Sequence, residues 1–164
     1  MDIATPDTNS ISAAAALLSA FATVAAAYAA FQSAKAAHEA AKATIFKERL
    51  EVLTAFLAFH GYWIRTGKPP LGQAFENPEA TNTWQQFLSA HLKAKLLFDA
   101  SIQNIFKEYR EMAAKYVYIE SELNKNHEDN NLWEEKAKIS KKITSDDEFN
   151  RIMKKFEKSM SFKI

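Results

Sequence analysis

Apolar residues recur through most of this chain at the three- and four-residue intervals typical of amphipathic α-helices. Between residues 45 and 65 they form two neighbouring stripes. The stripe with regular four-three spacing consists of Phe46, Leu50, Leu53, Leu57, His60 and Ile64. The flanking stripe consists of Phe56, Phe59 and Trp63. We expect the regular stripe, called here the predicted seam, to face a second helix running antiparallel.

A second long helix is predicted to begin near Asn82 or Thr83, where the same spacing continues over twelve positions. These positions are Trp84, Leu88, His91, Lys95, Phe98, Ile102, Ile105, Tyr109, Met112, Tyr116, Ile119 and Leu123. The two helices are separated by residues 66–82, which hold three of the four prolines and two of the three glycines. This composition predicts the one substantial loop of a long hairpin, with Leu53 and Leu57 facing Leu88 and Phe98.

Two shorter helices are expected after the polar stretch NKNHEDNN. The first carries Leu132, Trp133, Ile139 and Ile143, and the second opens with Ser145 and Glu148 at the spacing of a capping box. The predicted fold is therefore all-α: a long antiparallel helical hairpin with two short C-terminal helices.

The N-terminal helix is expected to extend as a single membrane span. Residues 8–34 contain no charge, and eleven of the 21 residues from Ile11 to Phe31 are alanine. A span needs roughly 20 mostly apolar residues. We therefore expect a tail at 1–10, a transmembrane helix at 11–34 and a cytoplasmic helical domain at 35–164.

The charges that flank this segment predict its orientation. Asp2 and Asp7 precede it, whereas Lys35, Lys42 and Lys47 follow it within about 20 residues. This asymmetry predicts a bacterial inner-membrane protein with its C-terminal domain in the cytoplasm, so membrane lipid is an expected partner. The chain contains no cysteine, which fits a reducing compartment.

Small residues lie at four-residue intervals on several faces of the same segment, for example Ala22, Ala26, Ala30 and Ala34. Such stripes allow two helices to approach closely, so we expect self-association or a protein partner through this helix. Two alternatives follow. The helix could oligomerise and permeabilise a membrane, as a defence or toxin effector, or residues 11–34 could pack against 106–126 in a soluble alanine-rich bundle.

The sequence carries no pattern that predicts catalysis, a cofactor or a metal site. His38 opens HEAAK, but Lys42 stands where a zinc-protease motif requires the second histidine. His60 and His91 are expected near one another on facing seams, as a polar contact or, less simply, a metal or pH-sensing pair. Lys95 is expected to pair with a carboxylate such as Glu51. The remaining acidic candidates are expected on solvated faces: Glu108, Glu111, Glu120 and Glu122.

Net charge also limits the partners. The formal charge of +1 provides no basic field that would attract nucleic acid. The sequence also contains no phosphate-binding loop, so it does not predict a small-molecule substrate.

Three segments give the chain a resemblance. They are AAKATIFKERLEVLTAFLAF, HLKAKLLFDASIQNIFKEYREMA and FNRIMKKFEKSMSFKI. Together they resemble a loose group of uncharacterised bacterial proteins with an N-terminal membrane helix and a small cytoplasmic helical domain.

In that group an aromatic residue and an arginine follow the anchor, here Phe46 and Arg49. A lysine-led apolar element opens the second long helix, here Lys93 to Phe98, and a phenylalanine-rich end closes the chain, here Phe156 to Phe162. The resemblance implies the fold and location but no activity.

These observations favour a non-enzymatic, membrane-anchored helical protein that interacts with or scaffolds a partner.

Overall fold

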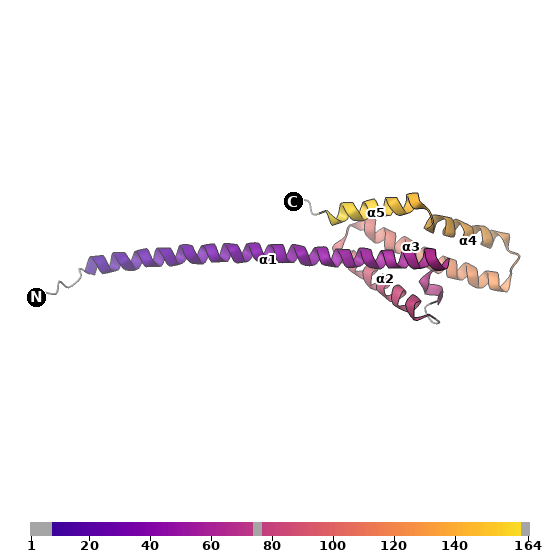
Figure 1. Ribbon diagram of the computed structural model, residues 1–164, viewed down its shortest axis with the longest axis horizontal. Coiled ribbons are helices and arrows are strands. Elements are labelled where there is room, and N and C mark those ends of the chain that lie inside the picture. Colours follow the sequence, from indigo (N-terminus) through magenta and orange to yellow (C-terminus); the bar gives the residue numbers. More distant parts are fainter. Residues whose placement is uncertain (1–7, 74–76, 162–164) are drawn as a thin grey trace, which may run out of the picture. The chain divides into compact units, whose positions relative to one another are not determined.

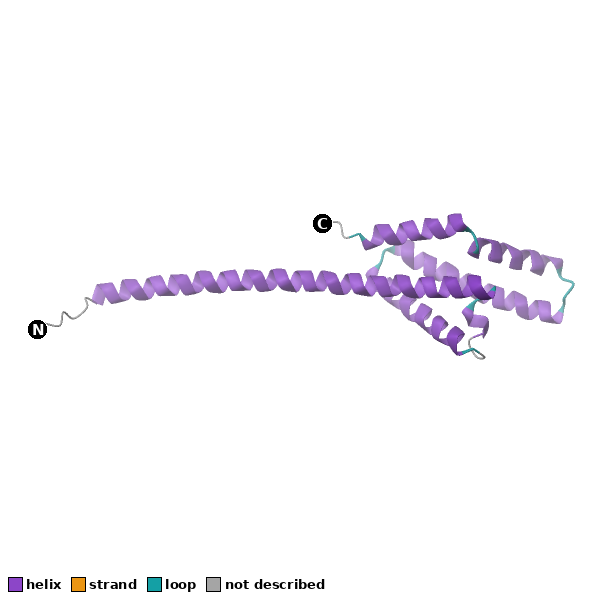
Figure 2. Cartoon of the chain, in the orientation of Figure 1, coloured by secondary structure: helices purple, strands orange, loops and turns teal. Residues whose placement is uncertain are grey.

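The computed structural model describes residues 8–73 and 77–161, except for the side chains of residues 8–11, 13–15 and 17. Within these ranges every element is helical, which confirms the all-α prediction (Figure 2). The elements are α1 (Thr8–Thr66), the 3-10 helix η1 (Pro70–Gln73), α2 (Pro78–Leu97), α3 (Ala100–Lys125), α4 (Asn130–Ile143) and α5 (Asp146–Met160). The chain divides into two compact units, Met1–Thr44 and Ile45–Ile164.

α1 is a continuous helix of 59 residues that ends where glycine and proline enter the sequence. Gly67 takes the left-handed conformation (φ 71°) that favours glycine, and its N–H donates to the Trp63 carbonyl oxygen at 2.8 Å. Pro69 and Pro70 follow and cannot continue a helix. The helix thus ends at Thr66, directly after the apolar pattern of residues 45–65.

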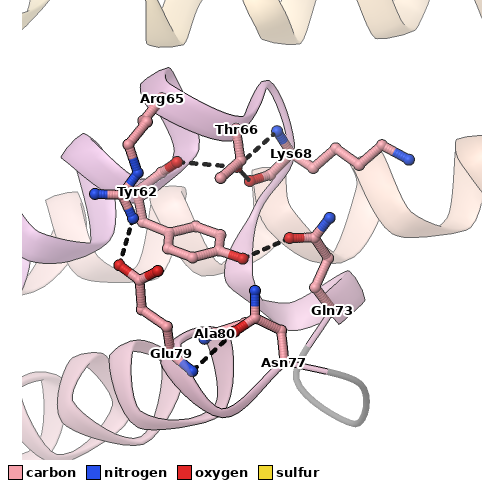
Figure 3. Close-up of polar contacts among 8 residues, drawn as sticks. All are labelled: Tyr62, Arg65, Thr66, Lys68, Gln73, Asn77, Glu79 and Ala80. Carbon is pink, nitrogen blue, oxygen red and sulfur yellow. Dashed lines mark hydrogen bonds and ion pairs between the residues drawn. The ribbon is translucent and has the colours of Figure 1, made fainter.

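A polar network holds the turn from α1 to α2 (Figure 3). The Tyr62 hydroxyl donates to the side chain of Gln73, and Arg65 forms an ion pair with Glu79. Asn77 caps α2 by accepting hydrogen bonds from the N–H groups of Glu79 and Ala80. Both ends of this long connection are therefore fixed by side chains.

The predicted second long helix is wrong in its continuity. α2 ends at Leu97, Phe98 is extended, and α3 begins at Ala100. The carboxylate of Asp99 accepts hydrogen bonds from the N–H groups of Ser101 and Ile102, so Asp99 is the N-cap of a new helix. Because Phe87 and His91 of α2 both lie against Phe106 of α3, the chain folds back at this break.

The core lies on the flanking stripe of α1. Val52, Phe56, Phe59 and Trp63 are buried. Phe59 stacks on Phe87 of α2 with ring centroids 4.0 Å apart, and Trp63 meets Tyr116 of α3 edge-on at 5.7 Å. Phe56 contacts rings from both α3 and α5, at 4.9 Å for Tyr109 and 5.5 Å for Phe156. This aromatic stripe is therefore the centre of the second unit.

The predicted seam does not form the expected contact. Leu50, Leu57 and Ile64 are 45, 36 and 50 % exposed, and Leu53 is half-buried. The long two-helix hairpin is consequently not confirmed: one arm is two helices, and the seam meant to join the arms is exposed at most of its positions, with His60 buried and Leu53 half-buried.

α4 and α5 complete the second unit (Figure 1). α4 runs back along α3, since Glu135 pairs with Lys115 at 3.2 Å and Lys142 pairs with Glu108. The Ser145 hydroxyl accepts from the N–H of Glu148, which confirms the predicted start of the last helix. The apolar face of residues 106–126 is thus buried within this unit. The soluble-bundle alternative stays a prediction.

Candidate interaction surface

The N-terminal half of α1 carries an apolar face that consists of Phe21, Val24, Tyr28 and Phe31, called here the N-terminal apolar face. These side chains are between 65 and 71 % exposed. Their three- and four-residue spacing places them on one side of the helix. Large apolar side chains in such a row are typical of a helix that packs against another helix.

The spacing of this face continues along the whole of α1. Steps of three and four residues lead from Phe31 through Lys35, His38, Lys42, Ile45 and Arg49 to Val52, Phe56, Phe59 and Trp63. The last four are the buried core stripe of the second unit. The apolar positions of the first unit therefore have the same sequence period as the core stripe of the second unit.

Uncharged, mostly small residues border the N-terminal apolar face on both sides. In a helix these border positions are Ala20 and Ala27 on one side and Ala25 and Gln32 on the other. Thr23 satisfies its hydroxyl within the helix, donating to the Ser19 carbonyl oxygen at 2.8 Å. No charged residue occurs between Leu18 and Ala34. Another helix could therefore approach this face closely without meeting a charge.

The membrane location predicted for this segment is contradicted. Among the residues whose side chains the structure describes, no helix contains an apolar stretch of the length and hydropathy that a membrane span requires. From Leu18 onward the segment is diluted by near-neutral alanine and by Ser19, Thr23, Gln32 and Ser33, and it ends at Lys35. Part of the predicted span, including Ile11 and Leu17, lies outside those side chains. The single-pass inner-membrane assignment is corrected accordingly.

A groove lies between α1 and α2 in the second unit, with a volume of about 470 Å³. Its floor includes Leu50, Val52 and Ala90. On its rim Lys93 donates to Glu51 at 2.8 Å, and this hydrogen bond holds the pKa of Glu51 below and that of Lys93 above its usual range. The rim charges thus neutralise one another. The expected partner of Glu51 was Lys95, but Lys95 is exposed and Lys93 takes that place.

His60 and His91 occupy separate environments. The His60 ring stacks on Phe149 of α5 at 4.8 Å, and its Nδ1 lies 3.3 Å from the Tyr109 hydroxyl. The His91 ring stacks on Phe106 at 5.9 Å. Burial lowers the pKa of both imidazoles, and Arg110 and Lys95 lower that of His91 further. The described contacts of His60 and His91 are with aromatic side chains, and none of them joins the two imidazoles, as the predicted pair would require.

The other candidate residues lie on ion-paired surfaces. Glu120 pairs with Lys68 at 2.8 Å and with Lys136 at 3.4 Å, while Glu108 pairs with Lys142. Glu111 and Glu122 pair with lysines on their own helix. In the HEAAK segment Lys42 lies 3.5 Å from Glu39. Across the described residues no three histidine or acidic side chains gather as metal ligands would.

Comparison with known proteins leaves the identity of the chain open. No protein-family model matches it, and neither the curated proteins nor the solved structures searched include a similar one. The resemblance to uncharacterised bacterial membrane-anchored proteins gains no support from these comparisons and stays a prediction.

Proposed function

We propose that this chain is a non-enzymatic helical interaction protein that binds another protein helix through the N-terminal apolar face of α1. The observation that supports this most directly is the exposure of Phe21, Val24, Tyr28 and Phe31 in a row. Contiguous exposed apolar surface on a protein is typical of an interaction site. The second unit then serves as the folded body to which this helix belongs.

The second unit contributes a stable platform in this proposal. We infer that the C-terminal part of α1 and α2 form an antiparallel pair. This inference is supported by contacts that run in opposite order along the two helices: Arg49 with Leu97, Glu51 with Lys93, Phe59 with Phe87 and Arg65 with Glu79. A packed aromatic core beneath this pair gives the interaction protein its own stability.

Site-specific photocrosslinking tests the proposal in growing cells. Tyr28 is replaced by p-benzoylphenylalanine, and Tyr118, a tyrosine of α3 with nearly the same exposed fraction (61 %), is replaced in a control chain. Irradiation should join position 28 to a protein and leave position 118 unjoined. Equal yields from both positions, or no crosslinked protein from position 28, would contradict the proposed function.

A further inference from the structure

We infer that the helix which covers the N-terminal apolar face is the same face of a second copy of this chain, paired in the antiparallel direction. This inference rests on the proposed function and names its partner. It is carried by the order of side chains along α1 and by the charges that follow them.

The apolar face is complementary to itself when it is reversed. In an antiparallel pair with its two-fold axis at residue 26, Phe21 lies opposite Phe31 of the other copy, and Val24 lies opposite Tyr28. All four side chains then have an apolar partner, in four successive layers. A two-fold axis makes the same surface serve both copies, which is the commonest arrangement of soluble homo-oligomers.

The borders of the face do not select against a second copy. Paired helices choose between self and other partners mainly through charges beside the apolar seam. Here those border positions hold Ala20, Ala25, Ala27 and Gln32, which carry no charge. The small side chains also allow the two backbones to approach closely, so two copies meet neither repulsion nor steric obstruction along the face.

The charges beyond Phe31 favour the antiparallel direction. The same spacing brings Lys35, His38 and Lys42 onto the side of the helix that carries the face. A parallel pair in register would place each of the two lysines beside its own counterpart. In the antiparallel pair the two copies of Lys35 are separated by 18 residues, about 27 Å along the axis. Like charges are thereby kept apart.

Distance measurement between spin labels distinguishes the possible pairings in the full chain. Because the chain contains no cysteine, Ala41→Cys introduces a single attachment point for a nitroxide. Position 41 lies 15 residues from the proposed axis and away from the face. The antiparallel pair separates the two labels by about 45 Å along the axis. A parallel pair would hold them at about 20 Å, a distance set mainly by helix diameter and label length.

The outcome decides between the alternatives. A pulsed-electron-resonance distance near 45 Å that disappears in an added Tyr28→Asp substitution, and remains with Tyr118→Asp, supports the inference. A distance near 20 Å overturns the antiparallel pairing. Absence of any coupling between labelled copies overturns self-association, while the proposed function survives if position 28 still crosslinks to a different protein.

Discussion

The Nε of Arg49 donates a hydrogen bond to the carbonyl oxygen of Leu97 at 3.0 Å. The same guanidinium donates from Nη1 to the Ser159 carbonyl oxygen at 2.8 Å and lies over the Phe98 ring at 5.4 Å from its centroid. Arg49 therefore binds carbonyl groups at the C-terminal ends of α2 and α5, where helices lack their own donors. One side chain of α1 joins three helices at the edge of the second unit.

Replacing Arg49 should destabilise the second unit more than replacing a neighbouring cation. Arg49→Met keeps much of the side-chain length but removes both donors, and hydrogen bonds that involve a charged group contribute about 1.5–3 kcal/mol. We expect a loss of about 2 kcal/mol in the free energy of unfolding, measured by urea denaturation. Lys47→Met, at an exposed position of the same helix, should change it by less than about 0.5 kcal/mol. Equal effects would contradict the bridging role.

Phe56 and Leu57 are neighbours in sequence with opposite surroundings. Phe56 is buried and Leu57 is 36 % exposed. Phe56→Ala should cost about 3–5 kcal/mol through lost burial and the cavity left behind, whereas Leu57→Ala should cost about 1 kcal/mol or less. Thermal and urea denaturation of the two variants measure this difference. A larger loss for Leu57→Ala would restore the predicted seam to the core.

The sequence predicted the helical class and the start of the last helix, but it placed the start of α2 near Asn82 or Thr83 and not at Pro78, and it did not show which face of α1 would be buried. Two apolar stripes run side by side on residues 45–65, and helical periodicity alone does not rank them. The stripe of Phe56, Phe59 and Trp63 forms the core because aromatic rings bury more apolar area. This outcome depends on rings from α2, α3 and α5, which local sequence does not place.

The break between α2 and α3 was missed for a related reason. The apolar spacing continues from Leu88 through Phe98 to Ile105, so the pattern predicted one helix. The local signal was Asp99, a side chain that favours helix N-caps. Asp99→Ala should destabilise the chain by about 1 kcal/mol because two N–H groups of α3 lose their acceptor. Asp99→Asn should retain most of that stability in the same urea titrations, and similar losses for both variants would contradict a capping role.

The buried imidazole of His60 makes stability depend on pH. Burial against Phe56, Tyr109 and Phe149 lowers its pKa in the folded state, whereas the unfolded chain titrates near 6.5. Above about pH 6.5 both states are neutral and the histidine causes no dependence. As the pH falls below 6.5, the unfolded state takes up the proton first. The free energy of unfolding therefore decreases until the pH reaches the lowered pKa of the folded state.

His60→Phe keeps the ring stack but removes the titrating group. Between pH 8 and pH 5.5 the native chain should therefore lose more unfolding free energy than this variant, by about 1 kcal/mol. His127→Gln, at an exposed position, should follow the native chain. The carboxylates of Glu148 in α5 and Glu108 in α3 lie close enough to influence Tyr109. They are present in all three proteins, so their effect cancels in the comparison. Parallel curves for the native chain and His60→Phe would contradict this account.

The interaction surface was visible in the sequence under another interpretation. The uncharged stretch and its small-residue borders predicted a helix with a partner, and that part of the expectation remains in the proposal. What sequence reasoning missed was the four-three order of Phe21, Val24, Tyr28 and Phe31, which continues the spacing of the core stripe. That order is present in the sequence, but neither the length of the segment nor its absence of charge reveals it.

The molar mass of the intact chain in solution tests the central claim most directly. The chain has a mass of 18.5 kDa, so sedimentation equilibrium in detergent-free buffer should show a concentration-dependent approach to about twice that mass. Phe21→Asp together with Phe31→Asp should return the mass to 18.5 kDa while the thermal transition of the second unit is retained. A mass of 18.5 kDa for the native chain at every concentration, or a doubled mass that both aspartates leave unchanged, would contradict pairing through the N-terminal apolar face.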